Sequence, residues 1–481
     1  MHLSTHIQGK TPSLWGLLLW AGIALLAGCA SSPKSAEAPA IEAPADWTSI
    51  GADSAAPEPW LEEFDSSELE ALVEEALANN AELQRVVAVF GQRIAEARIA
   101  GADLMPSADL GLNGARQKIS TFGPTSTGGV IFENYDLALN LSWELDLWGR
   151  LRNLTSAALA RVELTAAELE AARLSLAAQV TKSWLNWIEA QQQVDQAART
   201  AKAYVENQRT LESRFKRGLT EGIELRRIRS LTASAQADLA TRRQSRDAAA
   251  RYLEGLLGRY PSADLGGPMH LPELPSRIPA GLPAELIERR PDLIAAERQL
   301  AATERERRAA QKDLLPRISL TAGGGGSSQD FSRLLSGDFR VWSLAGNLTQ
   351  PIFQGGRILA NIDRSTSLAE QARANYRNAA LQAFLEVETT LAAESYLREQ
   401  YQHLERSAAE AKAAEALAWD GYRKGNREFL DTLDAQRSAA SARSQMIRAR
   451  NLLLQNRVDL YLALGGPFAE SRSLNNQNKA Q

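Results

Sequence analysis

The chain has 481 residues and a formal net charge of −4, with 44% hydrophobic and 6% aromatic residues. This length can form two or more ordinary domains, and no basic stripe is concentrated enough to indicate nucleic-acid binding. The abundance of Ala, Leu, Glu, Arg and Gln and the single cysteine are typical of long packed helices without disulfide bonds.

The N-terminus is typical of a secretory signal peptide. A weakly basic start precedes an apolar run from Leu14 to Ala27, which is too short to span a bilayer as a helix. The run ends in Leu26-Ala27-Gly28-Cys29-Ala30, where small residues precede the only cysteine. This stretch resembles the bacterial lipobox, which implies that residues 1–28 are removed and that Cys29 is acylated. A buried free cysteine after an ordinary signal peptide is the alternative.

Residue 31 is a serine, whereas an aspartate at that position usually keeps bacterial lipoproteins in the inner membrane. The lipobox resemblance therefore implies a destination in the outer membrane, where several acyl chains would make the anchoring stable. Residues 29–62 are rich in Ala, Pro, Ser and Glu, and we expect them to form a lipidated, extended linker.

The sequence contains a long internal repeat. Three pairs of glycines are each 207 positions apart (356 − 149, 425 − 218 and 465 − 258). A period of this length indicates a duplicated half-molecule rather than a short-period solenoid. We expect a first repeat at residues 63–258 and a second at 284–466. A Pro-rich linker at 259–283 would join them, and a polar tail would follow at 467–481.

Each repeat contains one very long helical segment followed by a shorter partner. Arg150–Arg217 and Arg357–Asp420 contain neither Gly nor Pro, and each would form a helix of about 100 Å. After a glycine-containing turn, Ile223–Glu254 and Asn426–Leu464 are expected to run back along them. Frequent alanines would let these helices pack closely. A coiled-coil rod explains this half of the pattern.

Segments with a period of two argue against a rod made only of helices. Apolar and polar residues alternate from Tyr135 to Asp146, which gives one apolar face and one acidic or polar face. Shorter strand segments lie near residues 108–112, 318–322 and 342–348, and helical patterns at Ser67–Ala102 and Ala284–Leu314 lead into the strand pairs.

Gly- and Ser-rich stretches at residues 121–129 and 323–328 are expected to connect the strands of each pair. Strands with one apolar and one polar face suit a membrane barrel, which has lipid outside and water inside. A soluble antiparallel sheet with one wet face would show the same alternation.

The number of strands predicts an oligomer. Two strands per repeat give four strands per chain. Four strands cannot close a barrel, and an open edge in lipid would leave backbone groups unpaired. The smallest closed membrane barrels have about eight strands. A dimer would supply that number and barely leave a lumen, whereas a cyclic trimer would supply about twelve.

Three stretches carry a family resemblance. The most specific is Ile278-Pro279-Ala280-Gly281-Leu282-Pro283 followed by residues 286–297, LIERRPDLIAAE. Residues 144–150, ELDLWGR, and residues 433–437, LDAQR, add to it. Over about residues 60–466 the chain resembles the TolC/OprM outer membrane efflux channels, and within them the NodT-type lipoprotein branch.

This resemblance implies a mainly α-helical protein with a transmembrane β-barrel part. Three copies would form a 12-stranded barrel continuous with a periplasmic α-helical tunnel. The resemblance also implies an outer membrane location and export of small molecules such as drugs, metals or solvents. The partners would be a periplasmic adaptor protein and, through it, an inner-membrane pump.

A second function remains open from the residues alone. The chain could be a non-conducting periplasmic scaffold or an adaptor-like lipoprotein built from helical hairpins. The alternating segments favour the channel, because an adaptor would instead carry compact β domains flanking one hairpin. The sequence does not specify the exported substrate, the pump class or the cognate adaptor.

No group of residues supports catalysis, a cofactor or a metal site. His2 and His6 lie in the signal peptide, His270 lies in the linker and His403 lies on a long helix, so no metal-ligand spacing exists. Gly323–Gly326 lacks the lysine and the following helix of a phosphate-binding loop. We therefore expect a protein that is not an enzyme.

Both helical turns share an aromatic-basic-basic-Gly pattern, in Phe215-Lys216-Arg217-Gly218 and Tyr422-Arg423-Lys424-Gly425. Glycine lets the chain reverse with positive φ and basic residues suit a helix C-terminus, so capping alone explains the pattern. In the family these turns form the periplasmic tip that meets the adaptor. The resemblance implies adaptor contact by Arg217, Gly218, Leu219, Thr220, Lys424 and Gly425.

A charged helix face follows the second turn. Arg427, Asp431, Asp434 and Arg437 are spaced by 4, 3 and 3 positions, which places them on one face. A solvated face with weak local ion pairs is one interpretation. If the face instead points to a threefold axis, its aspartates form carboxylate rings at the narrow end of the tunnel.

The resemblance supports the second interpretation. Asp431 and Asp434 match the family's aperture aspartates, and Leu430 matches an apolar constriction in the OprM branch. In the first repeat Glu224 aligns with Asp431 and would accept a hydrogen bond from Arg427. We therefore expect a periplasmic gate made of two latch residues, Tyr422 and Arg427, together with Leu430, Asp431, Asp434, Arg437 and Glu224.

Overall fold

The computed structural model describes residues 44, 47–48, 60–119, 129–268, 270–273 and 283–466. These residues belong to one compact unit that begins at Ile41. The predicted signal peptide, Cys29, most of the linker and the polar tail lie outside the described residues. Most of the predicted connection at residues 121–129 also lies outside them.

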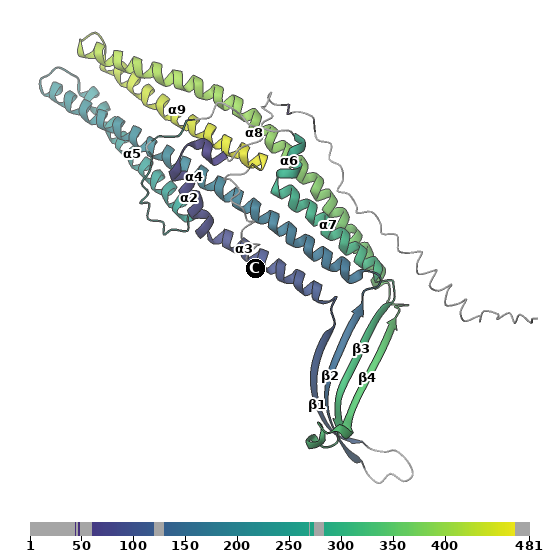
Figure 1. Cartoon of the computed structure of the whole chain (residues 1–481). Coiled ribbons are helices and arrows are strands. Elements are labelled where there is room, and N and C mark those ends of the chain that lie inside the picture. The colour runs from purple at the N-terminus through teal and green to yellow at the C-terminus, as the bar shows by residue number, and fades with distance from the viewer. Residues whose placement is uncertain are drawn as a thin grey trace, which may run out of the picture. The chain divides into compact units, whose positions relative to one another are not determined.

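Two long helical hairpins dominate the described part of the chain (Figure 1). Helix α4 (Arg150–Lys216) turns into α5 (Gly222–Leu256), and α8 (Arg357–Arg423) turns into α9 (Phe429–Leu464). Helices α4 and α8 have 67 residues each. The predicted duplication of hairpins is confirmed, with ends that differ from the expected ones by a few residues. None of the described helices combines the length and the hydropathy that a membrane-spanning helix needs.

Shorter helices precede the strands in both halves. They are η1 (Trp60–Phe64), α2 (Ser67–Asn79) and α3 (Ala81–Ala102) in the first half, and α6 (Pro283–Arg289) and α7 (Pro291–Lys312) in the second. Asn80 divides the predicted helical segment at Ser67–Ala102. Its backbone N–H donates to the carbonyl of Ala76, and its side chain accepts from the N–H of Leu83 at 3.0 Å. This residue therefore ends one helix and caps the next.

The six repeated glycines all have positive φ. Gly149 and Gly356 precede the long helices with φ of 74° and 80°, Gly218 and Gly425 follow them with 72° and 77°, and Gly258 and Gly465 end the partner helices with 75° and 62°. A side chain disfavours positive φ, so glycine occupies the helix ends that require this conformation. The glycines that are 207 residues apart therefore lie at equivalent helix ends in the two halves.

The four strands form one antiparallel sheet in the order β1-β2-β3-β4. Strands β1 (Ser107–Ile119) and β2 (Val130–Leu145) belong to the first half, and β3 (Arg317–Ser328) and β4 (Arg340–Thr349) to the second. Two short 3-10 turns, η2 (Phe331–Arg333) and η3 (Gly337–Phe339), lie between β3 and β4. The strands lie side by side, and α4 and α8 begin shortly after β2 and β4 (Figure 1).

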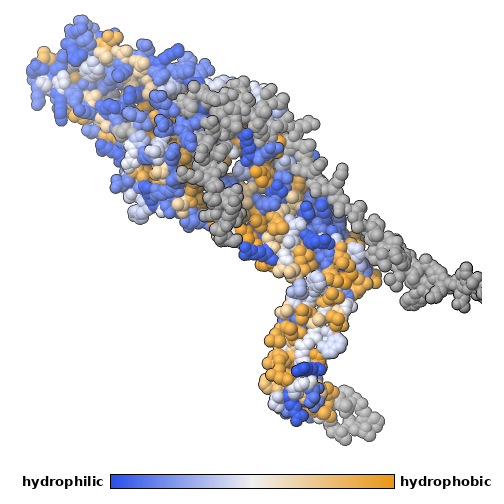
Figure 2. All heavy atoms as spheres, viewed as in Figure 1, coloured by the Kyte–Doolittle hydropathy of each residue, from blue (hydrophilic) through white to orange (hydrophobic). Residues whose placement is uncertain are grey.

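The strand register joins the predicted apolar faces into one continuous surface. Leu139 lies opposite Leu110 on β1 and Gly324 on β3, and Leu344 on β4 lies opposite Ala322. On the other face, Asn140 lies opposite Asp109 and Gly323. Figure 2 shows hydrophobic side chains gathered along the strands, whereas the hairpin ends are mostly hydrophilic on the visible face.

One expectation about the sheet is wrong. Residues 323–328 do not connect strands but form the second part of β3, where they pair with residues 135–140 of β2. Close packing explains why glycine occurs there. A Cβ atom on Gly325 would lie only 1.9 Å from the carbonyl oxygen of Leu137, and one on Gly326 would lie 2.1 Å from that of Leu334. Glycine in a strand commonly marks such a close backbone approach.

The main core lies where the hairpins meet the short N-terminal helices. Trp60 stacks on Tyr461 with ring centroids 5.6 Å apart, and Trp184 is buried in the same cluster. Beside it, Arg457 and Glu394 are fully buried and form an ion pair of 2.7 Å between α9 and α8. This core joins η1, α2, α4, α5 and α9, so both hairpins extend from one packed base.

Candidate functional site

Both hairpin turns are closed by the same hydrogen-bond motif. In the first turn, the N–H of Leu219 donates to the carbonyl of Arg214 at 3.0 Å and that of Gly218 to Phe215 at 2.9 Å. In the second, Asn426 donates to Gly421 at 2.9 Å and Gly425 to Tyr422 at 3.1 Å. These are Schellman motifs, in which glycine at positive φ satisfies the last helical carbonyls. Helix capping therefore accounts for both glycines, whatever else the turns contact.

The side chains of both turns are mostly open to solvent. Arg217, Leu219 and Lys424 are exposed, and Thr220 is half-buried with its hydroxyl donating to the carboxylate of Glu224. Lys424 forms an exposed ion pair with Asp420 at 2.6 Å. Such pairs contribute little to stability. The predicted tip residues are therefore accessible to a partner within a single copy of the chain.

A small apolar cluster joins the two hairpins just inside the turns. The first hairpin contributes Tyr204, Leu211, Leu225 and Ile228, and the second contributes Phe429 and Leu433, with Trp419 and Tyr422 packed against them. Because these side chains come from all four hairpin helices, the cluster fixes how the two turns lie relative to each other.

Tyr422 lies at the edge of this cluster with its ring enclosed by three side chains. Its ring centroid is 5.9 Å from that of Trp419 and 5.3 Å from that of Phe429. The guanidinium carbon of Arg214, from the first hairpin, lies 5.4 Å from the same centroid. Burial raises the pKa of Tyr422; Arg214 lowers it and Glu224 raises it by their charges. Both residues of the first hairpin thus lie close enough to act on Tyr422.

The predicted charged face of α9 is open. Asp431, Asp434 and Arg437 are exposed, and Leu430 is 43% exposed. The expected place of Arg427 on this helical face is wrong, because α9 begins only at Phe429 and Arg427 lies, exposed, in the turn before it. Residues on the opposite side of the helix are buried against the rest of the chain: Thr432, Leu433 and Gln436. Asp434 and Arg437 form an ion pair of 3.2 Å, which is largely exposed. This face therefore has no covering element among the described residues.

Arg427 makes a packing contact rather than an ion pair. Its Cγ atom would lie 3.0 Å from a Cβ atom placed on Gly421, so the lack of a side chain there makes room for it. Within the described part of the chain, no ion pair or hydrogen bond joins Arg427 to Glu224 or Asp431. The hydrogen bond from Arg427 to Glu224 therefore remains a prediction.

Neutral polar side chains also connect α4 with α9. The Nδ2 atom of Asn207 donates to Gln436 at 3.1 Å, and the hydroxyl of Ser444 donates to Gln193 at 2.6 Å. A cavity of about 650 Å³ lies alongside these contacts, between α4, α8 and α9. These contacts, like that of Arg214, join segments more than 200 residues apart, and no local motif indicates them.

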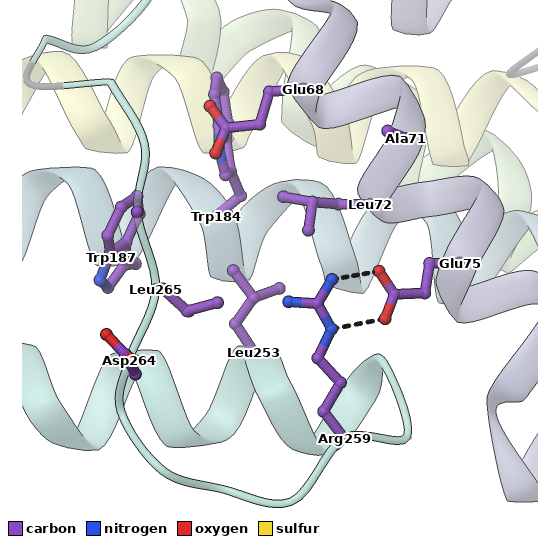
Figure 3. Close-up of a pocket in the computed structure, with 11 residues that line it drawn as sticks. Glu68, Ala71, Leu72, Glu75, Trp184, Trp187, Leu253, Arg259, Asp264 and Leu265 are labelled. Carbon is purple, nitrogen blue, oxygen red and sulfur yellow. Dashed lines mark hydrogen bonds and ion pairs between the residues drawn. The ribbon is translucent and has the colours of Figure 1, made fainter.

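A second cavity, of about 270 Å³, lies near the base of the hairpins and is lined by α2, α4, α5 and the segment that follows α5 (Figure 3). On its rim, Glu75 and Arg259 form an ion pair that neutralises both charges (Figure 3). Among the residues that the structure describes, no group of three or more His, Cys, Asp or Glu side chains could hold a metal ion. The hairpin ends are therefore the best candidate site.

The comparisons with known proteins identify the class. A model of the outer membrane efflux protein family matches residues 72–259 and 282–466, in one segment for each half. The chain belongs to this family.

Individual relatives match nearly the whole chain. Outer membrane protein OprJ of Pseudomonas aeruginosa is 32% identical over 459 residues, which cover 94% of this chain and 96% of OprJ. The toluene efflux pump outer membrane protein TtgF of Pseudomonas putida is 32% identical over 424 residues, which cover 87% and 88%. The open outer membrane channel MtrE of Neisseria gonorrhoeae has a TM-score of 0.82 and 29% identity, and the match covers 92% of this chain and all of MtrE.

Membership of this family confirms the predicted family, fold, function, partners and location. The chain is an outer membrane channel of a tripartite efflux system. It assembles as a trimer and works with a periplasmic adaptor and an inner-membrane pump. Proteins of this family are channels, not enzymes. The alternative of a non-conducting scaffold does not agree with this membership.

Proposed function

We propose that the channel exports small organic molecules of the solvent and antibiotic type, which the pump selects, and that the chain itself catalyses no reaction. The names of several relatives support this class of cargo: one is a toluene pump protein, another an antibiotic pump protein and a third a pyoverdine exporter. The channel contacts its cargo only in transit, so a single built binding pocket is not required.

Deleting the gene for this chain, with the adaptor and pump left intact, tests the cargo class. We expect tolerance to toluene and to hydrophobic antibiotics to fall several-fold, because the cargo loses its exit. Tolerance to copper salts should stay at the level of the parent strain. A loss of metal tolerance alone, or no change in any of these tolerances, would show that the cargo class is wrong.

The proposal includes a gate at the hairpin ends. Its support is the exposed face of α9, where Leu430, Asp431, Asp434 and Arg437 are accessible in a single copy, and the exposed Arg427 in the turn just before the helix. If threefold symmetry turns this face toward the axis, three copies place rings of carboxylates around the narrow end of the tunnel. Charged hydrogen bonds of about 1.5–3 kcal/mol each would then bias the closed state. The latch residues are Tyr422 and Arg427, with Glu224 on the neighbouring hairpin.

The exposed turns provide a docking surface beside this gate. Arg217, Gly218, Leu219 and Thr220 form one turn, and Lys424 and Gly425 lie in the other. An adaptor that binds both turns can change the distance between the hairpins and so act on the gate. This placement would connect docking of the adaptor with opening of the channel.

The mature protein is expected to begin at an acylated Cys29, which lies outside the described residues. The small residues before the cysteine and the Ala- and Pro-rich segment after it support this assignment. Mass spectrometry of the N-terminal peptide should show a diacylglyceryl cysteine with an additional amide-linked acyl chain. An unmodified cysteine, or a mature N-terminus elsewhere, would contradict the assignment. Cys29→Ser should weaken membrane retention.

A further inference from the structure

We propose that Arg214 is a positioning residue of the gate, because its guanidinium lies over the ring of Tyr422 and thereby holds the second hairpin against the first. This inference rests on the proposed gate and adds a residue to it. Arg214 lies in the last turn of α4, and Tyr422 lies in the last turn of α8. The contact therefore joins the two long helices at the end where the gate lies.

The ring of Tyr422 has contacts within its own hairpin and one contact from the other hairpin. Trp419 and Phe429 contact it from within its own hairpin, so these contacts persist if the second hairpin moves as one body. The guanidinium of Arg214, at 5.4 Å from the ring centroid, comes from the other hairpin. Separation of the hairpins must break this contact. The cation–π contact therefore stabilises the arrangement in which the two turns lie together.

The surroundings of Arg214 favour the ring over a carboxylate partner. In the described part of the chain, its guanidinium has no ion pair, and its buried Nε atom has no hydrogen-bond partner. A planar cation in contact with an aromatic face gains electrostatic stabilisation, and the gain increases when water is excluded. The aromatic ring is thus the main favourable contact of this charge.

The contact uses the ring of Tyr422 and not its hydroxyl group. Within the described residues, no hydrogen bond involves the Tyr422 hydroxyl, whereas three side chains contact the ring. Substitution by phenylalanine would preserve these contacts, and substitution by leucine would remove them. This difference separates a ring-based latch from a hydroxyl-based one.

The same residue is also tied to the exposed turn. The backbone carbonyl of Arg214 accepts the hydrogen bonds from the N–H groups of Arg217 and Leu219, at 3.0 Å each. A partner that shifts the turn at Gly218 would therefore displace the residue whose guanidinium contacts the ring of Tyr422. Arg214 provides a short route by which adaptor contact at the tip reaches the gate.

The test compares single-channel recordings of purified trimers in lipid bilayers. Arg214→Gln removes the cation, Arg214→Lys keeps a charge but lacks the planar group, and Tyr422→Leu removes the ring. We expect Arg214→Gln and Tyr422→Leu each to raise the open probability about tenfold, since loss of a partly buried cation–π contact is of that size. Arg214→Lys should raise it less, because an ammonium can still lie over the ring. Tyr422→Phe keeps the ring and should open the channel far less than Tyr422→Leu does. The control is Arg209→Gln, which removes an exposed arginine from the same helix and should leave the open probability unchanged.

Two further measurements guard against a general structural effect. All variants should give the normal heat-modifiable trimer on gels, and their cation selectivity should be unchanged because no gate carboxylate is altered. The double variant Arg214→Gln with Tyr422→Leu should open no more than Tyr422→Leu alone, since loss of the ring already removes the contact with Arg214. Additive opening would show that the two residues act separately.

The outcomes separate this inference from the proposed gate. If Tyr422→Phe opens the channel as much as Tyr422→Leu while Arg214→Gln has no effect, the hydroxyl group holds the gate and the role of Arg214 is refuted. Arg427→Ala tests the gate by itself and should raise the conductance. If Arg427→Ala leaves the conductance unchanged and the Arg214 and Tyr422 variants leave the open probability unchanged, the gate lies elsewhere and both proposals fail.

Discussion

Leu139→Arg should sharply reduce the amount of trimer in the outer membrane, whereas the neighbouring Asn140→Arg should assemble at close to the normal level. Leu139 lies on the apolar face of β2, between Leu110 and Gly324 of the adjacent strands. If that face contacts lipid, a charge near the midplane costs about 2–4 kcal/mol in each copy. Asn140 lies on the opposite, polar face, where a charged side chain can reach water.

Heat-modifiable migration of outer membrane fractions measures this result, because a folded barrel trimer and its denatured chains migrate differently. The two variants introduce the same residue at adjacent positions of one strand, so each serves as the control for the other. Equal loss of trimer in both would show that the facing assignment is wrong. A stable monomer in detergent, seen by native mass spectrometry, would contradict the trimeric barrel itself.

Asp431→Ala combined with Asp434→Ala should weaken cation selectivity and reduce the block by multivalent cations. Both aspartates are exposed on one face of α9. If that face lines the narrow end, the double variant removes two rings of three carboxylates and with them the field that attracts cations. Reversal potentials in a salt gradient and titration with a trivalent cation would measure the change.

A matched control removes the same charge elsewhere. Glu70→Ala with Glu74→Ala alters two exposed carboxylates on α2, which lies away from the hairpin turns (Figure 1). This control should keep the original selectivity. If the aspartate variant forms normal trimers with unchanged selectivity and block, the charged face of α9 is an ordinary solvated surface. If the control changes selectivity equally, the effect reflects net charge and not the position of the carboxylates.

The features that could be predicted from the sequence are those that depend on nearby residues. A glycine at positive φ is required at each helix end, so the six glycines marked the repeat and both hairpins. Likewise, alternation along β2 follows from the geometry of a single strand. Helical periodicity placed Asp431, Asp434 and Arg437 on one exposed face of α9, but it wrongly extended that face to Arg427, which precedes the helix.

The features that the sequence did not indicate depend on packing between distant segments. Residues 323–328 resemble a loop by composition, but they pair with β2 because its backbone approaches too closely for side chains. Arg214 lies one residue before the recognised turn motif, and its partner Tyr422 is on the other hairpin. One sign was present: the 207-residue offset aligns Arg214 with Gly421, so the two turns were not equivalent at this position.

The sheet has a genetic consequence. Within the described chain, the outer edges of β1 and β4 have no partner strand, so each copy must be completed by two neighbours. Consider a variant chain whose β1 edge can still pair but whose β4 edge is blocked. It would enter a trimer through β1 and leave the barrel of that trimer open at β4. In a cell that makes equal amounts of both forms, only about one trimer in eight would contain no defective copy. Such an allele would therefore be dominant, although the normal gene remained fully expressed.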